Sequence, residues 1–305
     1  MDLYKLNKSK LEEVKNVPFK LEKDIQSLVE NNIQVLFGLE FVKTEFQLNG
    51  LRIDSLVFDT QSNSFVIIEY KKSQSYSVID QGYSYFSLLL NNKADFILEY
   101  QEQTNKSLKK DDVDWSQSRV IFISPQFTTY QKQSIEFKDL PFELWEIKKY
   151  SNDTIILNQH KSTSQESVKT ISSKDNRAEQ VSKEIKVYRE EDHIAKGNPE
   201  TQELYKELRD MVFSIDDFEV NPLKFWINFK LNKKWVLDMD IQKKGVKLHL
   251  NLKKGNLDDP KGIFRDVSEI GHYGYGDYEI VVSPDSDLDY LMSCIKQAYK
   301  YHTNL

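Results

Sequence analysis

The segment from residue 51 to 72, LRIDSLVFDTQSNSFVIIEYKK, constrains the fold more than any other stretch of the chain. It contains two runs rich in Ile, Leu, Val and Phe, and charged residues interrupt both of them. Asp54 lies in the first run, and Glu69 and Lys71 lie in the second. Residues 61–63 between the runs are polar and favour a turn. The segment therefore predicts two adjacent β-strands that carry charge where a strand is normally apolar.

These strands belong to a predicted first domain, residues 1–159. Asn49-Gly50 is typical of a two-residue hairpin turn, and Pro18 and Gly38 are suited to begin and end a helix. The predicted elements are a helix (18–37), strands (39–48, 51–60 and 64–72), a helix (78–90) and strands (94–100 and 119–124). The order α-β-β-β-α-β predicts an α/β fold with a mixed sheet.

The charged residues are expected to gather on one face of the sheet. Alternate side chains of a strand share a face, so Glu69 and Lys71 lie about 7 Å apart along the strand. If the two runs form a hairpin, Asp54 can lie beside Glu69. The alternative is an ion pair between Glu69 and Lys71 on an exposed face, with Asp54 solvated.

Two carboxylates in a half-buried site repel each other and lose hydration, and a bound cation removes both costs. Oxygen ligands without His or Cys favour Mg²⁺ or Mn²⁺ over zinc. A lysine beside a metal-bound water can orient that water or stabilise negative charge on a phosphate. The cluster thus has the chemical groups needed to hydrolyse a phosphodiester.

The pattern Asp54…Glu69-Tyr70-Lys71 resembles that of the PD-(D/E)XK nuclease superfamily, which has a restriction-endonuclease-like (tRNA endonuclease-like) fold, and in particular its endonuclease NucS-like and RecB-like branches. The resemblance implies that Asp54, Glu69 and the backbone carbonyl of Tyr70 bind metal and that Lys71 is the catalytic lysine. It covers residues 18–124. Ile53 stands where the family pattern has proline.

Three further residues fit the resemblance. Gln81 and Tyr85 form the Q-x-x-x-Y pattern of RecB-like nucleases, which implies that they orient substrate or water; core packing with a hydrogen bond is the alternative. Glu22 stands where many members have an acidic residue near the metals. The helix macrodipole also favours a carboxylate there, and Glu30 is a rival for the metal-binding role.

Residues 160–198 are polar and predict a linker that is partly helical, and residues 199–305 predict a smaller α+β domain. Its predicted elements are a helix (200–213), strands (224–231, 235–241, 246–253 and 278–283) and a helix from Ser286. The stretch RDVSEIGHYGYGDYEI resembles an uncharacterised C-terminal domain that accompanies nuclease-like domains. That family has carried the label "predicted transport protein", for which this chain, without an apolar run of membrane-spanning length, gives no physical support.

Glycines 271, 274 and 276 predict a turn that frames His272 and Asp277, not a phosphate-binding loop, because no lysine follows them.

One strand of this second domain carries a candidate nucleic-acid face. Lys247, His249 and Lys253 share one side of the strand, and residues 230–261 contain nine lysines against four aspartates. The alternative is a solvated sheet face, and we favour it because a run of charged residues is usually exposed surface without a binding role.

The net charge of −6 gives no overall basic signature, and the single cysteine, Cys294, excludes an internal disulfide and suits a reducing compartment. Without a signal peptide or a membrane-spanning run, we expect a cytoplasmic protein that does not enter membranes. The sequence predicts a Mg²⁺- or Mn²⁺-dependent nuclease, for which DNA is favoured over RNA as the substrate. The alternative is a nucleic-acid- or protein-binding module on a nuclease fold without significant hydrolysis. Separately, the C-terminal domain is a candidate contact for a protein partner.

Overall fold

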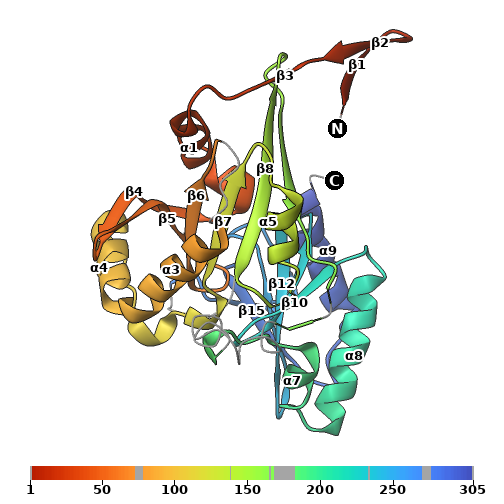
Figure 1. Cartoon of the computed structure of the whole chain (residues 1–305). Coiled ribbons are helices and arrows are strands. Elements are labelled where there is room, and N and C mark those ends of the chain that lie inside the picture. Colours follow the sequence, from red (N-terminus) through yellow and green to blue (C-terminus); the bar gives the residue numbers. More distant parts are fainter. Residues whose placement is uncertain are drawn as a thin grey trace. The chain divides into compact units, whose positions relative to one another are not determined.

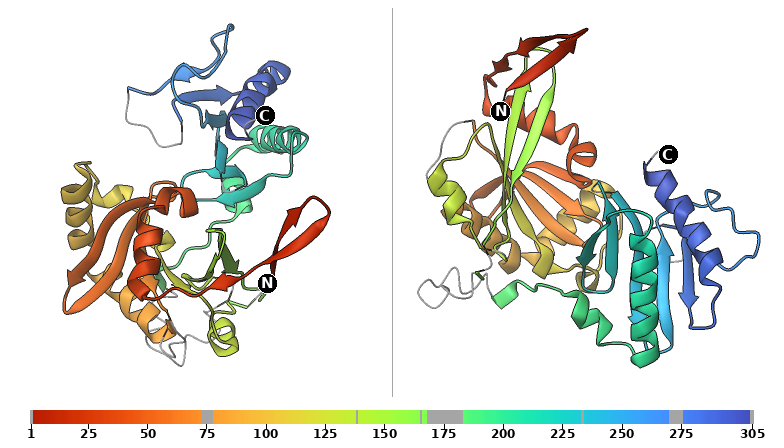
Figure 2. Two further views of the ribbon diagram at one scale, coloured as in Figure 1. Left: turned by 90° about the horizontal axis from the view of Figure 1, so that it is seen from above. Right: turned by 90° about the vertical axis from the view of Figure 1, so that its right-hand side faces the viewer.

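The structure of the chain is a computed structural model that describes residues 2–72, 78–137, 139–164, 166–167, 183–232, 234–269 and 276–303. These residues form two compact units, Met1–Lys186 and Val187–Leu305 (Figures 1 and 2). The boundary falls inside the range 160–198 that the sequence predicts to be a linker. The predicted turn at Gly271 and Gly274, with His272, lies outside the described residues. In the part of the chain that the structure describes, no helix has the length and apolarity needed to cross a membrane.

The first unit is built on a mixed seven-stranded sheet. Its strands are β3 (Asn16–Val17), β8 (Phe142–Tyr150), β7 (Arg119–Ser124), β6 (Ser64–Tyr70), β5 (Leu51–Asp59) and β4 (Glu40–Leu48) in spatial order, with β9 (Ile155–His160) also paired to β8. β4, β5 and β6 are antiparallel, whereas β6, β7 and β8 are parallel. The predicted α/β class and mixed sheet are therefore confirmed.

Helices cover both faces of this sheet. The first layer is α1 (Glu22–Glu30) and α2 (Ile33–Phe37); the second is α3 (Val78–Asn91), α4 (Lys93–Thr104) and α5 (Thr129–Ser134), with two short 3₁₀ turns, η1 (Lys110–Asp112) and η2 (Trp115–Gln117). On β6, Phe65 and Ile67 join the core under α3 and α4, and Ile68 and Tyr70 join the core under α1. The side chains of β6 therefore alternate between the two faces of the sheet, as predicted. Glu69 and Lys71 belong to the face that α3 covers.

Two predictions for this unit are wrong. Residues 94–100, predicted as a strand, lie in α4, because Phe96 and Tyr100 are buried at a spacing of four and therefore share a helix face. The helix predicted for 18–37 begins only at Glu22 and is divided into α1 and α2. Gly38 ends α2 as predicted, with a positive φ of 70°. No prediction covered β8, β9 or the N-terminal hairpin of β1 (Leu3–Asn7) and β2 (Lys10–Val14).

The second unit is a smaller α+β structure, as predicted. Its sheet is antiparallel in the order β10 (Glu219–Pro222), β11 (Ile227–Leu231), β12 (Lys234–Gln242), β13 (Gly245–Leu250), β15 (Tyr278–Val282) and β14 (Arg265–Asp266). The unit also contains α7 (Glu190–Ile194), and α8 (Pro199–Phe213) and α9 (Leu288–Thr303) pack on the apolar face of the sheet. Gly276 has a φ of 91°, and a Cβ there would collide with Leu250 O, so only glycine fits.

Candidate functional site

The register of the β5–β6 hairpin brings Asp54 and Glu69 together. Ser55 pairs with Ile68, so one step further Asp54 and Glu69 lie at matching positions on the two strands. The Tyr70 backbone N–H donates to Asp54 Oδ2 over 3.1 Å, which fixes that carboxylate at the carboxyl end of β6. Antiparallel neighbours at matching positions share a face, so both acids lie on the side covered by α3. The hairpin thus forms the acidic pair expected from the sequence.

Glu69 is the most confined member of the group, with a side chain that is 4% exposed. Its Oε1 accepts hydrogen bonds from Lys71 Nζ and from Gln81 Nε2, each over 2.6 Å. Its Oε2 is buried and has no hydrogen-bond partner among the described residues. A buried carboxylate oxygen without a donor is costly, so this oxygen is available to a ligand.

Burial and the neighbouring Glu69 also affect the ionisation of Asp54. The pKa of Asp54 is raised from 3.8 to about 6, mainly because burial penalises the charged form and next because of the negative charge of Glu69. The Tyr70 N–H and the Lys71 charge lower it, but not enough to compensate. A carboxyl that its surroundings leave under-compensated is a candidate ligand for a cation.

Helix α3 carries the support for Glu69. Gln81 Nε2 donates to Tyr85 Oη over 3.0 Å as well as to Glu69, and Tyr85 Oη donates to the Arg52 carbonyl over 2.8 Å. Burial, followed by the charge of Glu69, raises the pKa of Tyr85, so its hydroxyl stays protonated as a donor. The structure therefore brings Gln81 and Tyr85 into one chain of hydrogen bonds that links α3 to β5 and β6.

The remaining two predicted metal ligands are placed differently. Glu22, the first residue of α1, is exposed and accepts a hydrogen bond from the Lys72 N–H over 2.9 Å. Its charge makes a minor contribution to the raised pKa of Asp54. The Tyr70 side chain points into the opposite core, where its hydroxyl lies 3.0 Å from Ser55 Oγ. Only the backbone carbonyl of Tyr70 is therefore a candidate ligand.

Sequence reasoning missed a buried network behind the site. Gln26 Nε2 donates to the Asp54 carbonyl over 3.0 Å and to Glu30 Oε1 over 2.9 Å. Ser55 Oγ donates to the same Glu30 oxygen over 2.6 Å. The sequence signal was a polar pair at a spacing of four, Gln26 and Glu30, beside the apolar stripe of α1. Glu30, the rival to Glu22, thus lies on the opposite face, where it holds the side chains of Gln26 and Ser55.

These residues fit a hard divalent cation. Asp54 and Glu69 offer carboxylate oxygens, one of them without a donor, and Tyr70 offers a carbonyl. Among the described residues, no group of three or more His, Cys, Asp or Glu side chains is arranged to hold a metal ion. This donor set suits Mg²⁺, which commonly keeps several waters and binds one or two protein carboxylates.

The predicted nucleic-acid residues of the second unit do not form one open face. His249 is buried, and its Nε2 lies 3.2 Å from Glu279 Oε2; Lys247 Nζ lies 3.4 Å from the same oxygen. Lys253 follows the end of β13 and is exposed, 3.6 Å from Asp277 Oδ1. Of the three, Lys253 offers the most accessible cation.

Comparison with known proteins gives three similarities. Residues 190–302 match the family described as Domain of unknown function (DUF5655). An uncharacterised protein of Haemophilus influenzae is 47% identical over 302 residues, which are 98% of this chain and 100% of that protein. A repair endonuclease from Pyrococcus abyssi aligns with 17% identity and a TM-score of 0.25, over 43% of this chain and 50% of its own. The last similarity is too weak to carry an argument about fold or activity.

Proposed function

This chain belongs to the family of that uncharacterised Haemophilus influenzae protein, and we propose that its first unit is a metal-dependent nuclease of the PD-(D/E)XK type that hydrolyses DNA in preference to RNA. The observation that carries the proposal is the buried Glu69 Oε2, which has no hydrogen-bond donor among the described residues. The register of the hairpin brings the carboxylate of Glu69 beside Asp54. The raised pKa of Asp54 supports it independently of that hydrogen-bond pattern.

Asp54, Glu69 and the Tyr70 carbonyl would hold Mg²⁺ or Mn²⁺. The bound ion supplies a Lewis acid and a water of lowered pKa for attack on the phosphate. Hydrogen bonds already fix the carboxylates of Glu69 and Asp54, so an ion would bind there with little reorganisation of the side chains.

Lys71 provides the positive charge of the site. Its ammonium is held against Glu69 Oε1, and its side chain is largely buried. In this position the ammonium can stabilise the negative charge that develops on the phosphate, and it does not need to bind the metal. Gln81 holds the orientation of Glu69, and Tyr85 holds Gln81, so both act as positioning residues.

A second function remains a candidate because of the same ion pair. Glu69 Oε1 already accepts two hydrogen bonds, one of them from Lys71, as in a closed structural ion pair. With a net charge of −6, the chain has no overall attraction for a polyanion, which counts against nucleic acid as a substrate and as a bound partner alike. In this alternative the unit is a binding module for nucleic acid or protein without hydrolysis.

A cleavage assay separates the two functions. Single- and double-stranded DNA and RNA are incubated with the full chain in Mg²⁺ or Mn²⁺, and the Lys71→Ala variant is compared with Lys72→Ala. Lys72 is the matched control because it is exposed and contributes its backbone N–H to Glu22. The nuclease proposal predicts cleavage by the wild type and by Lys72→Ala, and none by Lys71→Ala.

In the same experiment, Lys71→Ala should still bind Mn²⁺ in calorimetry, because lysine is not a ligand. A wild type that binds nucleic acid but cuts none of the four substrates in either metal would establish the binding module instead. A wild type that neither cuts nor binds them would remove both nucleic-acid functions.

A further inference from the structure

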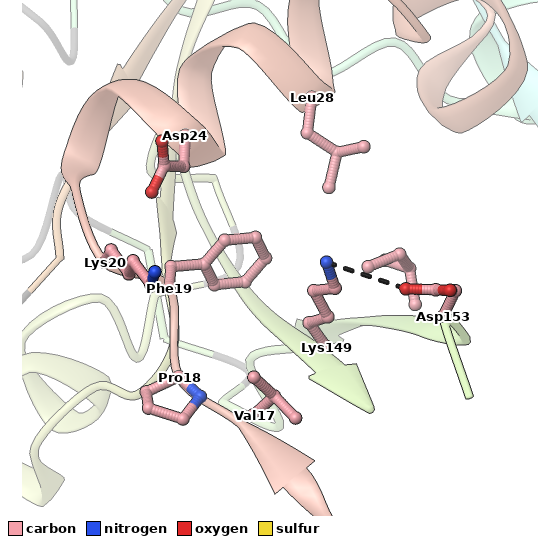
Figure 3. Close-up of a pocket in the computed structure, with 9 residues that line it drawn as sticks. Val17, Pro18, Phe19, Lys20, Asp24, Leu28, Lys149 and Asp153 are labelled. Atoms are coloured by element: carbon pink, nitrogen blue, oxygen red, sulfur yellow. Dashed lines mark ion pairs between the residues drawn. The ribbon is translucent and has the colours of Figure 1, made fainter. Parts of the chain in front are cut away.

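Helix α1 carries a polar stripe that consists of three residues at a spacing of four: Glu22, Gln26 and Glu30. Residues four apart on a helix share a face, so the three side chains lie on one side of α1. Ile25 and Val29 of the same helix are fully buried in the core between α1 and the sheet. Asp24 and Leu28 lie on the other side of the helix, where they line a pocket (Figure 3). The polar stripe is therefore a separate surface of α1.

The central member of the stripe, Gln26, is 4% exposed and holds the backbone of Asp54. Its Nε2 donates to the Asp54 carbonyl over 3.0 Å and to Thr44 Oγ1 on β4 over 3.1 Å. β4 is irregular at this point, because Glu45, which lies opposite Asp54 in the register, has a positive φ of 52°. Gln26 thus joins β4 to β5 where regular strand pairing is interrupted.

The two outer members hold neighbouring points of the hairpin. Glu22 Oε2 accepts a hydrogen bond from the Lys72 N–H over 2.9 Å, just after the end of β6. Glu30 Oε1 accepts from Ser55 Oγ over 2.6 Å, and that hydroxyl lies 3.0 Å from Tyr70 Oη. Each outer contact is therefore one residue away from a residue of the proposed metal site.

The position of Gln26 would be filled more cheaply by an apolar side chain, because a buried amide has to be hydrogen-bonded. What a hydrogen-bonded network adds in a core is one fixed arrangement of the groups that it joins. Removing the partners that orient metal ligands in this way typically costs about 10–100-fold in metal affinity. These values set the size of effect to look for at the stripe.

We propose that the polar stripe of α1 positions the metal site from behind the sheet. Gln26 fixes the backbone of Asp54, the outer members fix β5 and the chain after β6, and none of the three binds the metal. Glu22 and Glu30 act as hydrogen-bond acceptors, so their negative charge is not required. The inference rests on the proposed function, because it assigns supporting residues to the same site.

Calorimetry of Mn²⁺ binding to the full chain tests the proposal without depending on cleavage. Gln26→Leu removes the amide that holds Asp54 and should raise the Kd for Mn²⁺ about tenfold or more. The matched control is Leu28→Ala, which lies on the pocket side of the same helix and loses packing against the same core. This control should lower the melting temperature but leave the Kd unchanged.

Glutamine replacements separate positioning from metal binding. Glu30→Gln keeps an acceptor for Ser55 Oγ and should keep the Kd of the wild type, whereas Glu30→Leu should raise it. Glu22→Gln should also keep that Kd, because its amide oxygen still accepts the Lys72 N–H. If either glutamine variant binds Mn²⁺ as weakly as Gln26→Leu, the charge of that residue is required and the proposal is overturned. The two variants of Glu30 also decide the matter where Gln26→Leu does not fold.

The failure of this inference can be told apart from the failure of the proposed function. A wild type that binds no Mn²⁺ removes the metal site, and both are then wrong. A wild type that binds Mn²⁺ with a Kd that Gln26→Leu does not change overturns the positioning role alone. An equal rise of the Kd in Leu28→Ala would have the same meaning, because metal affinity would then follow the stability of α1.

Discussion

Both units of the molecule bury acidic side chains within a β-sheet, and they compensate them in opposite ways. In the first unit, Asp54 and Glu69 lie together with Lys71 as the nearby cation, and Glu69 Oε2 has no partner among the described residues. In the second unit, Glu279 is surrounded by Lys247, His249 and Arg265.

The cause of the difference is the register of the second sheet. Successive strands align one polar side chain each in a row that crosses β11, β12, β13, β15 and β14. The row consists of Asn228, Asp238, His249, Glu279 and Arg265. Burial acts to raise the pKa of Glu279, but the charges of Lys247 and His249 outweigh it and hold that pKa below its usual 4.5. At Asp54 the balance is reversed, and the pKa rises to about 6.

The comparison distinguishes a compensated acid, Glu279, which we expect to stabilise its sheet, from an under-compensated one, Asp54, which we propose binds a ligand together with Glu69. Buried charges that are paired need nothing further, and those left unpaired lower the stability of the fold unless something binds them.

The largest expected effect separates the two regions by activity. Asp54→Ala should reduce metal-dependent cleavage by about 100-fold or more, the usual cost of removing an essential electrostatic group. Glu279→Ala should leave the rate of the folded protein within about twofold of the wild type, a change equivalent to less than 1 kcal/mol. Steady-state rates on one DNA substrate measure both. Equal losses of cleavage rate in the two variants would contradict the distinction between Asp54 and Glu279.

The next largest effect is on stability, and it is expected for the variant of Glu279. Glu279→Ala leaves Lys247 and His249 without their shared carboxylate and should lower the free energy of unfolding by about 1–3 kcal/mol. Urea unfolding of the full chain measures the loss. An unchanged midpoint would mean that the ion pairs of the second sheet are only surface contacts.

The pH dependence of Asp54 sharpens the comparison further. Its pKa is 3.8 as a free side chain and about 6 in the folded chain. A carboxyl with a raised folded pKa contributes stability that is fully present below pH 3.8 and is lost as the pH rises through 6. Without metal, Asp54→Asn should therefore be more stable than the wild type above pH 6, by on the order of 1–2 kcal/mol. Near pH 3.8 the two proteins should converge. Thermal melts of both proteins across this pH range measure the difference in stability. A difference between Asp54→Asn and the wild type that does not change with pH would contradict the raised pKa of Asp54.

The smallest expected effect concerns the support of Glu69. Tyr85→Phe removes the hydroxyl that joins Gln81 to the Arg52 carbonyl and should cost about 1 kcal/mol of stability. As a positioning residue, Tyr85 should affect kcat more than KM. A change confined to KM would instead place Tyr85 in substrate binding.

The hairpin and its acidic pair could be predicted because they follow from local rules. Alternation along β6 and the turn signals before and after β5 determine which side chains share a face. The strand prediction for 94–100 failed because a short apolar run fits a strand as well as a helix, and burial at a spacing of four decided for α4.

Contacts between distant segments could not be predicted in this way. Alternation placed Lys247 and His249 on one face of β13, but the burial of His249 depends on strand neighbours such as Glu279, which is 30 residues away in the chain. The support of the Asp54 backbone by Gln26 similarly requires α1 to pack on β5, across 28 residues.

Anomalous diffraction from crystals grown in Mn²⁺ tests the central claim most directly, because it locates the ion without depending on activity. We expect a manganese peak between the carboxylates of Asp54 and Glu69, with Glu69 Oε2 as a ligand, and none at Glu279. The matched crystal of Asp54→Asn should lose most of that peak. If crystals saturated with Mn²⁺ show no manganese bound to Glu69 Oε2, the proposed metal site is contradicted.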